Sequence, residues 1–157
     1  MNDLKVEKIK IRAVNVPLNK PVIAHLGTFE KWPFLCLDVH TNKGLIGKSY
    51  IGPYLVNQLS AIAKCIEALS IPFLNRNIKP FNFFEEGFNK TALLGYQGIG
   101  LYALAALDIA FWDVYAKAAN MPLSSLLGSD LKPIKTYNSR GLWLIPLNKI
   151  DEEIHDL

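Results

Sequence analysis

Charged and apolar residues alternate at the start of the chain and predict a β-strand. The alternation covers residues 4–18 and changes phase between Arg12 and Val14, as in a half-exposed strand with a bulge near Arg12. Two further β-rich runs, 34–39 and 45–51, are joined by a Thr-Asn-Lys-Gly connection whose Asn and Gly suit a hairpin. Together these runs predict a three-stranded antiparallel sheet.

The segment between the first two predicted strands has apolar residues without a clear period. Pro17 and Pro21 are expected to end the first strand, because proline cannot donate a backbone hydrogen bond. Residues 22–29 are therefore interpreted as a loop that carries hydrophobic side chains.

After Pro53 the apolar period changes from two to about 3.6, which predicts helices. The first expected helix ends at Pro72, and its apolar face carries Leu55, Leu59, Ile62, Ile66 and Leu69. Asn82 is expected to cap a second helix, whose apolar positions are Phe84, Phe88 and Leu93. Residues 101–116 are apolar on nearly every side, which predicts a helix surrounded by its neighbours.

The last part of the chain predicts a turn, a strand and the start of another helix. Residues 123–128 form the turn, with Gly128 as a C-terminal cap, and residues 134–139 follow as a strand. Asp151 and the two glutamates after it suit the first turn of a helix. The expected class is α+β: a three-stranded antiparallel sheet followed by a helical bundle, with one added strand.

Composition indicates a globular chain with a packed core. Of 157 residues, 50% are hydrophobic and 20% are charged, which argues against disordered and fibrous classes. The net charge of +3 is spread along the chain, so it lends little support to nucleic-acid binding. The N-terminal residues do not resemble a signal peptide, and Asp108 and Asp113 interrupt the longest apolar run. We expect a cytoplasmic protein without a membrane partner.

Residues able to do chemistry are scattered. The glycine-rich stretch 95–100 lacks the spacing of a dinucleotide fingerprint, and the histidines and cysteines form no metal-binding or disulfide pattern. Asp108 and Asp113 project about 140° apart around a helix, too far apart for paired acid–base work. Asp108 is expected to bind a neighbouring backbone or cation, and Asp113 to pair with Lys117.

Residues 104–128, a helix that includes Asp108 and Asp113 followed by a turn that ends at Gly128, resemble a family signature. The signature is that of the mandelate racemase and muconate lactonizing enzyme branch of the enolase superfamily, and the closest pattern is that of mandelate racemase. Further segments resemble this family in the same order, namely 12–18, 27–28, 47–50, 94–96 and 137–139.

The resemblance implies a two-domain enzyme. Residues 1–130 would form an N-terminal capping domain, and residues 131–157 the first strand and the start of the first helix of an incomplete (β/α) barrel. Members of the family remove the proton α to a carboxylate and stabilise the enediolate on Mg²⁺, which leads to racemisation or dehydration of 2-hydroxy or sugar acids. The complete enzyme would take a small carboxylate substrate and form a homo-oligomer.

The family's lysine bases and carboxylate metal ligands would lie on barrel strands after Leu157. We therefore expect this chain alone to be inactive and to bind no metal. Lys8 and Lys10 have a Lys-x-Lys spacing, but strand alternation already explains them as a solvated face. A different class of function stays open, a stand-alone binding or assembly module that has lost the catalytic barrel.

The resemblance also implies substrate contacts. Segment 22–29 would be a mobile lid, and its apolar residues would line a pocket together with Tyr54 from the loop after the third strand. Ser139 matches a position that hydrogen-bonds the substrate carboxylate. Arg140 replaces the family's histidine, which favours a more acidic or sugar-acid substrate. The predicted contacts are Val22, Leu26, Phe29, Tyr54, Ser139 and Arg140.

Overall fold

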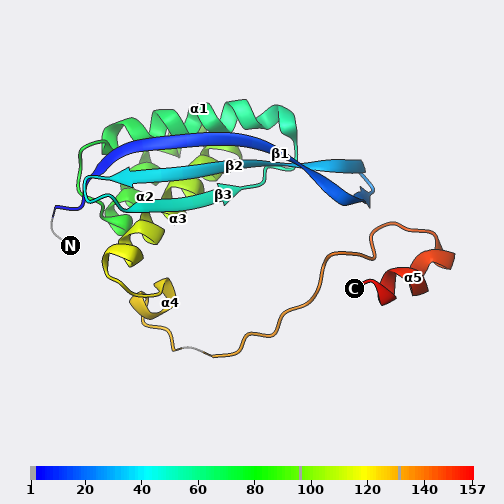
Figure 1. Ribbon diagram of the computed structural model, residues 1–157. Helices are drawn as coiled ribbons and strands as arrows, with labels where there is room; N and C mark the ends of the chain where they lie inside the picture. Colours follow the sequence, from blue (N-terminus) through cyan, green and yellow to red (C-terminus); the bar gives the residue numbers. More distant parts are fainter. Residues whose placement is uncertain (1–2, 96, 131) are drawn as a thin grey trace.

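A long three-stranded sheet with helices on one face forms the body of the protein (Figure 1). The computed structural model describes residues 3–95, 97–130 and 132–157. The strands pair antiparallel in the order β1-β2-β3, and their bounds are β1 Val6–Ala24, β2 Gly27–Thr41 and β3 Ile46–Ile51. The predicted α+β class and antiparallel sheet are confirmed.

The first two strands form a longer hairpin than the sequence predicted. β1 continues past Pro17 and Pro21, and the expected loop at 22–29 is wrong, because Val22 pairs with Phe29 across the hairpin. β1 is an edge strand, where proline is tolerated because one side of the backbone needs no partner.

The irregularities of the hairpin lie near its ends. The register shifts between Val6 and Lys8 and again between Pro17 and Val22. The predicted bulge near Arg12 is wrong, since Arg12 lies within regular pairing. The second shift separates the outer end of the hairpin from the rest of the sheet.

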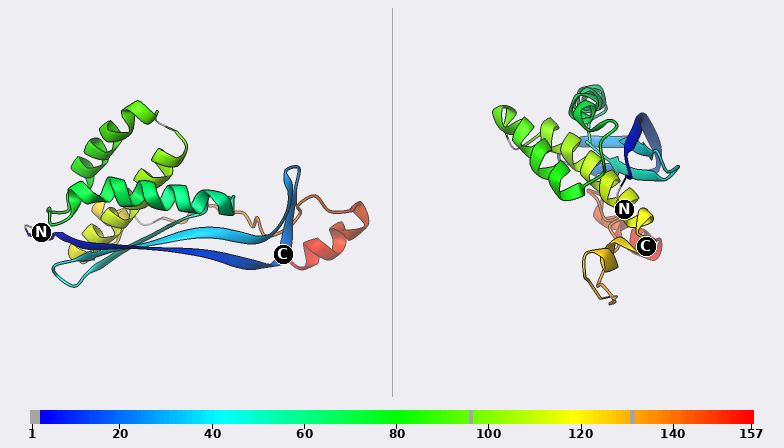
Figure 2. Two further views of the ribbon diagram at one scale, coloured as in Figure 1. Left: turned by 90° about the horizontal axis from the view of Figure 1, so that it is seen from above. Right: turned by 90° about the vertical axis from the view of Figure 1, so that its left-hand side faces the viewer.

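Helices α1 and α3 lie against the sheet, and α2 packs on α3 (Figures 1 and 2). The helices are α1 Leu59–Ser70, α2 Pro80–Thr91, α3 Ile99–Ala118, α4 Leu123–Leu126 and α5 Ile150–His155. Short 3₁₀ turns occupy Val56–Gln58, Ile71–Phe73, Ala92–Leu94 and Leu147–Lys149.

The start of α2 differs from the prediction. Asn82 does not cap the helix, because α2 begins at Pro80, whose fixed φ and missing N–H suit a first helical position. Phe83 and Gly87 face the core, whereas Phe84 is 43% exposed. Of the expected apolar positions, Phe88 packs against the core, whereas Phe83 takes the place expected for Phe84.

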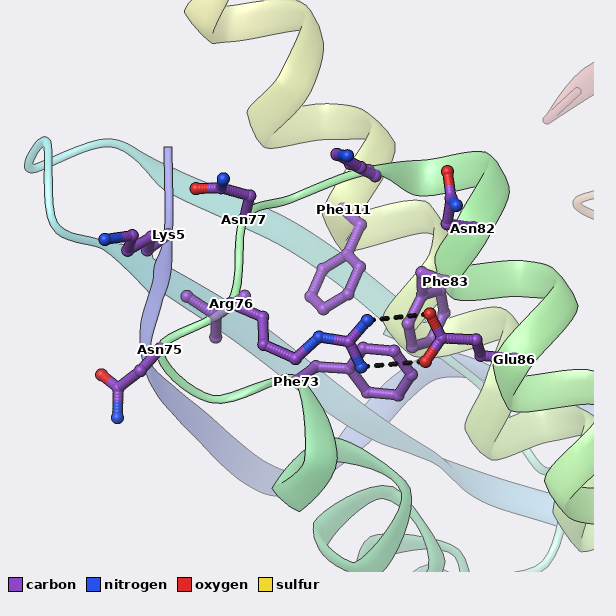
Figure 3. Close-up of a pocket in the computed structure, with 11 residues that line it drawn as sticks. Lys5, Phe73, Asn75, Arg76, Asn77, Asn82, Phe83, Glu86 and Phe111 are labelled. Atoms are coloured by element: carbon purple, nitrogen blue, oxygen red, sulfur yellow. Dashed lines mark hydrogen bonds and ion pairs between the residues drawn. The ribbon is translucent and has the colours of Figure 1, made fainter. Parts of the chain in front are cut away.

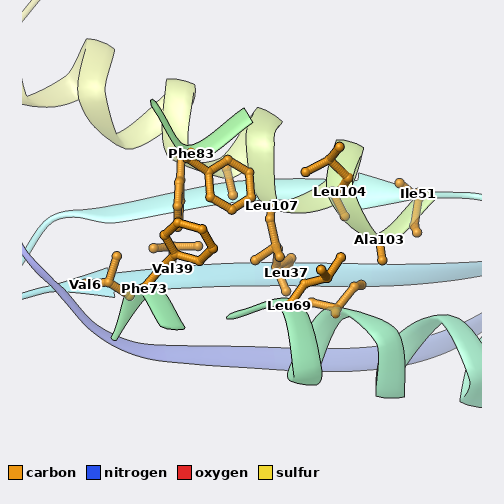
Figure 4. Packing of buried hydrophobic residues seen from close by; sticks show 14 of the residues in the cluster. Val6, Leu37, Val39, Ile51, Leu69, Phe73, Phe83, Ala103, Leu104 and Leu107 are labelled. Atoms are coloured by element: carbon orange, nitrogen blue, oxygen red, sulfur yellow. The ribbon is translucent and has the colours of Figure 1, made fainter. Parts of the chain in front are cut away.

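Buried side chains of the sheet and of the three long helices form one core (Figure 4). α3 approaches β3 closely at Gly47, where a Cβ atom would lie 2.1 Å from the carbonyl oxygen of Ala110. α3 is long and apolar enough to cross a membrane, although it contains two aspartates. Its buried residues, among them Leu104, Phe111 and Val114, pack within this core.

The C-terminal part crosses from α4 to the hairpin end of the sheet (Figure 1). The strand predicted at 134–139 is absent among the described residues, because this extended segment has no neighbouring strand with which to form a ladder. The turn at 123–128 is confirmed by α4 and by the positive φ of Gly128, and the acidic start of α5 is confirmed at Asp151.

Candidate functional site

The hairpin end of the sheet carries the predicted lid residues. Beyond β3 the first two strands continue alone and project past the helices (Figure 2). Leu26 lies at the tip and is 88% exposed, while Val22 and Phe29 are half-buried. The prediction of a mobile apolar lid thus falls on a paired hairpin rather than on an irregular loop.

Three aromatic rings connect this hairpin to the loop after β3. The ring centroids of Phe29 and Trp32 are 5.9 Å apart, and those of Trp32 and Tyr54 are 5.4 Å apart, both edge-to-face. Phe29 and Tyr54, which were predicted to share a pocket, therefore contact the same indole ring. The sequence analysis did not include Trp32 among the candidate residues, although a large aromatic residue three positions after Phe29 was a signal that could have indicated it.

Tyr54 has an unusual backbone conformation. Its φ is 63°, and the Leu55 N–H donates a hydrogen bond of 2.7 Å to the Pro53 carbonyl, which closes a three-residue turn around Tyr54. A bulky residue at positive φ is strained, and such strain concentrates at ligand-binding sites. The Tyr54 side chain is 59% exposed, so its ring contacts Trp32 and also faces solvent.

A pocket of about 250 Å³ opens beside these rings. Its lining includes Asn15, Thr28, Phe29, Lys31, Tyr54 and Leu55. Two predicted contacts, Phe29 and Tyr54, thus line one cavity with polar groups beside them. Val22 and Leu26 are not among its described lining residues.

The C-terminal segment returns to the same end of the sheet. The Leu144 N–H donates to the Ile23 carbonyl at 3.0 Å, which adds a contact to the free edge of β1. The Lys20 ammonium donates to Asp156 at 2.7 Å and to Glu153 at 3.1 Å. Sequence reasoning missed these contacts because their partners are more than a hundred residues apart.

Ser139 and Arg140 belong to this returning segment, and both are exposed. The Asn138 side chain donates to the Leu157 carbonyl at 3.0 Å and accepts a hydrogen bond of 3.1 Å from the Arg140 N–H. The turn that carries both predicted carboxylate-binding residues is therefore held against the end of α5.

A pocket of about 380 Å³ lies at the other end of the sheet (Figure 3). Arg76 donates to both carboxylate oxygens of Glu86 at 2.8 and 2.9 Å and lies over the Phe73 ring. These hydrogen bonds raise the pKa of Arg76 and lower the pKa of Glu86. Because the two charges neutralise each other, we interpret this ion pair as a structural contact that attaches α2 to the segment before it, not as a ligand site.

The outer face of the sheet bears an open groove of about 550 Å³. Val14, Phe34 and other apolar residues line it, and Arg12 donates to Asp38 at 2.6 Å. The Arg12 hydrogen bond lowers the pKa of Asp38. The charges of this pair neutralise each other, and the pair lies on the face of the sheet away from the helices.

The two aspartates of α3 differ in their surroundings. Asp113 pairs with Lys117 at 2.6 Å, which confirms that prediction, and it also accepts a 2.7 Å hydrogen bond from the Lys48 N–H. The Asp108 Oδ1 atom is buried without a hydrogen-bond partner among the described residues, and burial raises its pKa. The expected tie from Asp108 to a backbone group or cation is therefore not formed by this atom.

The described residues offer no site for the Mg²⁺ ion that the family uses. Across 3–95, 97–130 and 132–157, no three or more His, Cys, Asp or Glu side chains converge to hold a metal ion. We assign no chemical step through a metal to these residues.

The fold and the hairpin site define a capping domain of the enolase superfamily. Residues 6–128 match the family described as Mandelate racemase / muconate lactonizing enzyme, N-terminal domain, and the chain belongs to this family. A solved enolase from the alpha-proteobacterium bal199, with bound Mg, matches with a TM-score of 0.92 and 31% identity, over 98% of this chain and 42% of that chain.

Two further relatives show the range of the family. A solved enolase from Bradyrhizobium, complexed with magnesium and mandelic acid, matches with a TM-score of 0.78 and 29% identity, over 85% of this chain and 37% of that chain. The D-galactonate dehydratase family member RspA of Cellvibrio japonicus is 35% identical over 97 residues, or 60% of this chain and 23% of that protein.

The chain thus spans well under half of the length of these relatives. Curated relatives carry the names of dehydratases, an epimerase and a cycloisomerase. The predicted family is therefore confirmed. The relatives do not show a specific likeness to mandelate racemase within that family.

Proposed function

We propose that this chain is the substrate-capping part of an enzyme that removes the proton α to a carboxylate, as mandelate racemase and the sugar-acid dehydratases do. One observation carries the proposal: Trp32 contacts both Phe29 and Tyr54 and so joins the hairpin and the loop after β3 into one apolar surface. An apolar cover excludes water and strengthens electrostatic interactions beneath it.

In this proposal the catalytic base and the metal ligands come from a barrel, since the described residues contain no metal-binding cluster. Mg²⁺ bound there would supply Lewis-acid stabilisation of the developing negative charge. The part of this chain is to position the substrate and to shield its α-carbon from water.

The substrate we propose is a 2-hydroxy or sugar acid. The Ser139 hydroxyl would donate to one carboxylate oxygen, and the Arg140 guanidinium suits a second carboxylate or a polyhydroxylated chain. Both groups are exposed and free to reach a ligand. Relatives named D-galactonate dehydratase family member RspA and L-talarate/galactarate dehydratase support the sugar-acid class.

A chimera tests the proposal. Residues 1–130 of this chain would replace the corresponding capping residues of the Cellvibrio D-galactonate dehydratase family member, and turnover would be followed by exchange of the α-proton in deuterated water. We expect Phe29→Ala with Tyr54→Ala to raise KM about tenfold or more in the chimera, because the loss of both rings removes apolar contact with the substrate. The matched control is Phe81→Ala, an exposed ring on α2.

Two results would contradict the capping function. Turnover by the 157-residue chain alone, with Mg²⁺ and the same acids, would show that it holds a complete active site. Unchanged kinetics after removal of both rings would show that the hairpin surface does not cover the substrate.

A further inference from the structure

Lys20 lies at the point where the hairpin changes register, between Pro17 and Val22. Its ammonium donates to Oε2 of Glu153 at 3.1 Å and to Oδ2 of Asp156 at 2.7 Å. These carboxylates are one helical turn apart at the end of α5. A single cation on the hairpin is therefore held by Glu153 on α5 and by Asp156, the residue that follows this helix.

A second contact lies close to the first. The Ile23 carbonyl, on the edge strand β1, accepts the hydrogen bond from Leu144 at 3.0 Å. The C-terminal segment thus contacts the hairpin on the outer side of the register shift, through a backbone bond that does not depend on Lys20.

The C-terminal segment contacts itself on both sides of the predicted carboxylate-binding residues. Asn138 is bonded to the Leu157 carbonyl, and Gly141 packs so tightly on α5 that a Cβ atom there would lie 2.7 Å from Oε1 of Glu153. Ser139 lies between these two anchored positions. The α5 region therefore contacts both the hairpin, through Lys20, and the turn that carries Ser139 and Arg140.

The placement of these segments is shared with a solved relative. The match to the bal199 enolase covers 98% of this chain with a TM-score of 0.92, so it includes both the hairpin and most of the C-terminal segment. The hairpin and the C-terminal segment can therefore adopt this arrangement within a chain more than twice as long.

We propose that Lys20 is a positioning residue: its two ion pairs latch the hairpin onto α5 beside Ser139 and Arg140, and release of the latch lets the hairpin end open. Exposed ion pairs are weak and screened by salt, which suits a contact that must break each time a ligand enters. The register shift next to Lys20 provides a place for the strand to bend. The binding of a substrate under the hairpin rests on the proposed function. The contact between Lys20 and the α5 region does not.

Hydrogen–deuterium exchange of the whole chain tests the latch without substrate or metal. In Lys20→Met, amides of residues 18–29 and 142–146 are expected to exchange about threefold faster or more, because local opening becomes easier. Lys20→Arg should keep wild-type protection, since it retains both ion pairs. Lys8→Met, an exposed lysine at the other end of β1, should change nothing at the hairpin end.

Salt gives a second readout, because screening weakens an ion pair but not the packing of the lysine's aliphatic chain. At about 1 M NaCl the wild-type hairpin end should approach the exchange rate of Lys20→Met, while Lys20→Met itself responds little to salt. Equal exchange in wild type and Lys20→Met, or equal acceleration in Lys8→Met, would overturn the latch. The latch can hold even if the chimera shows no capping role, so the two proposals fail separately.

Discussion

Two residues of this chain are held in environments that cost free energy. Tyr54 is strained at positive φ, and Asp108 has a buried carboxylate oxygen without a partner among the described residues. Strain of this kind persists only where the surrounding structure enforces it. Tyr54 contacts the Trp32 ring, and Asp108 lies half-buried on α3 next to the buried Leu107.

Asp108 gives the protein a pH dependence with a defined sign. Burial raises its pKa above the usual value of 3.8, so the folded chain holds this proton more tightly than the unfolded chain does. Its contribution to stability is therefore present below the usual pKa and is lost as the pH rises through the raised pKa.

We predict that Asp108→Asn raises the free energy of unfolding at pH 7 by about 1 kcal/mol, because it removes a desolvated charge. The gain should shrink as the pH falls and disappear near about pH 2.5, well below the usual pKa of 3.8, where the wild-type carboxyl is protonated in both states. Urea denaturation at the two pH values measures this difference. The control is Asp130→Asn, an exposed position, and a variant that is less stable than wild type at pH 7 would contradict the prediction.

At the scale of elements, helix α3 has two roles. It contributes side chains to the core, and it hydrogen-bonds to the free edge of the sheet at β3. The Asp113 carboxylate accepts the Lys48 N–H, and Lys117 donates to the Ile46 carbonyl at 2.9 Å. Both backbone groups lie on β3, an edge strand. Unpaired edges invite strand-to-strand association, and here a helical ion pair occupies part of that edge.

Asp113→Ala should lower the free energy of unfolding by roughly 1–2 kcal/mol, since it leaves the Lys48 N–H without an acceptor and Lys117 without its partner. The matched control is Glu67→Ala, which breaks the exposed pair between Lys64 and Glu67 and should change stability by less than about 0.5 kcal/mol. Chemical denaturation measures both. Equal effects of the two variants would show that Asp113 is only a surface charge.

Element prediction succeeded where side-chain period alone decides the structure. The amphipathic pattern of α1 and the apolar run of α3 placed both helices, because a helix must bury its apolar face. The hairpin was mistaken for a loop, because the tolerance of Pro17 and Pro21 depends on β1 being an edge strand. Strand order is a property of the whole sheet and is not visible in local sequence.

At the scale of the whole molecule, residues 132–157 are attached less firmly than the rest. They lie outside the hydrophobic core and contact the hairpin through Lys20 and Ile23. Segments with few buried apolar contacts open locally at low cost and are cleaved first.

Limited trypsin digestion should therefore cut first after Lys135 or Arg140, and should leave a resistant fragment that contains the sheet and α1 to α3. Mass spectrometry of early time points identifies the cuts. First cleavage within the sheet, for example after Lys10 or Lys48, would contradict the prediction. The same digestion also tests the predicted domain boundary near residue 130.

Only some residues of the candidate site could be predicted from the sequence. Phe29 and Tyr54 were expected to share a surface on the strength of a family resemblance, and the structure brings them onto one indole ring. Trp32 and Lys20 were missed, because their roles depend on partners supplied by another element. The contribution of Ser139 and Arg140 to a substrate site stays a prediction.

The sequence by itself determined the α+β class, the long helices, the Asp113–Lys117 pair and the family signature, because each depends on residues that are neighbours along the chain or share a regular period. Tertiary structure alone decided the length of the hairpin, the aromatic contact through Trp32 and the ion pairs of Lys20 with α5. These features join segments far apart in sequence, and only the folded packing brings such groups within contact distance.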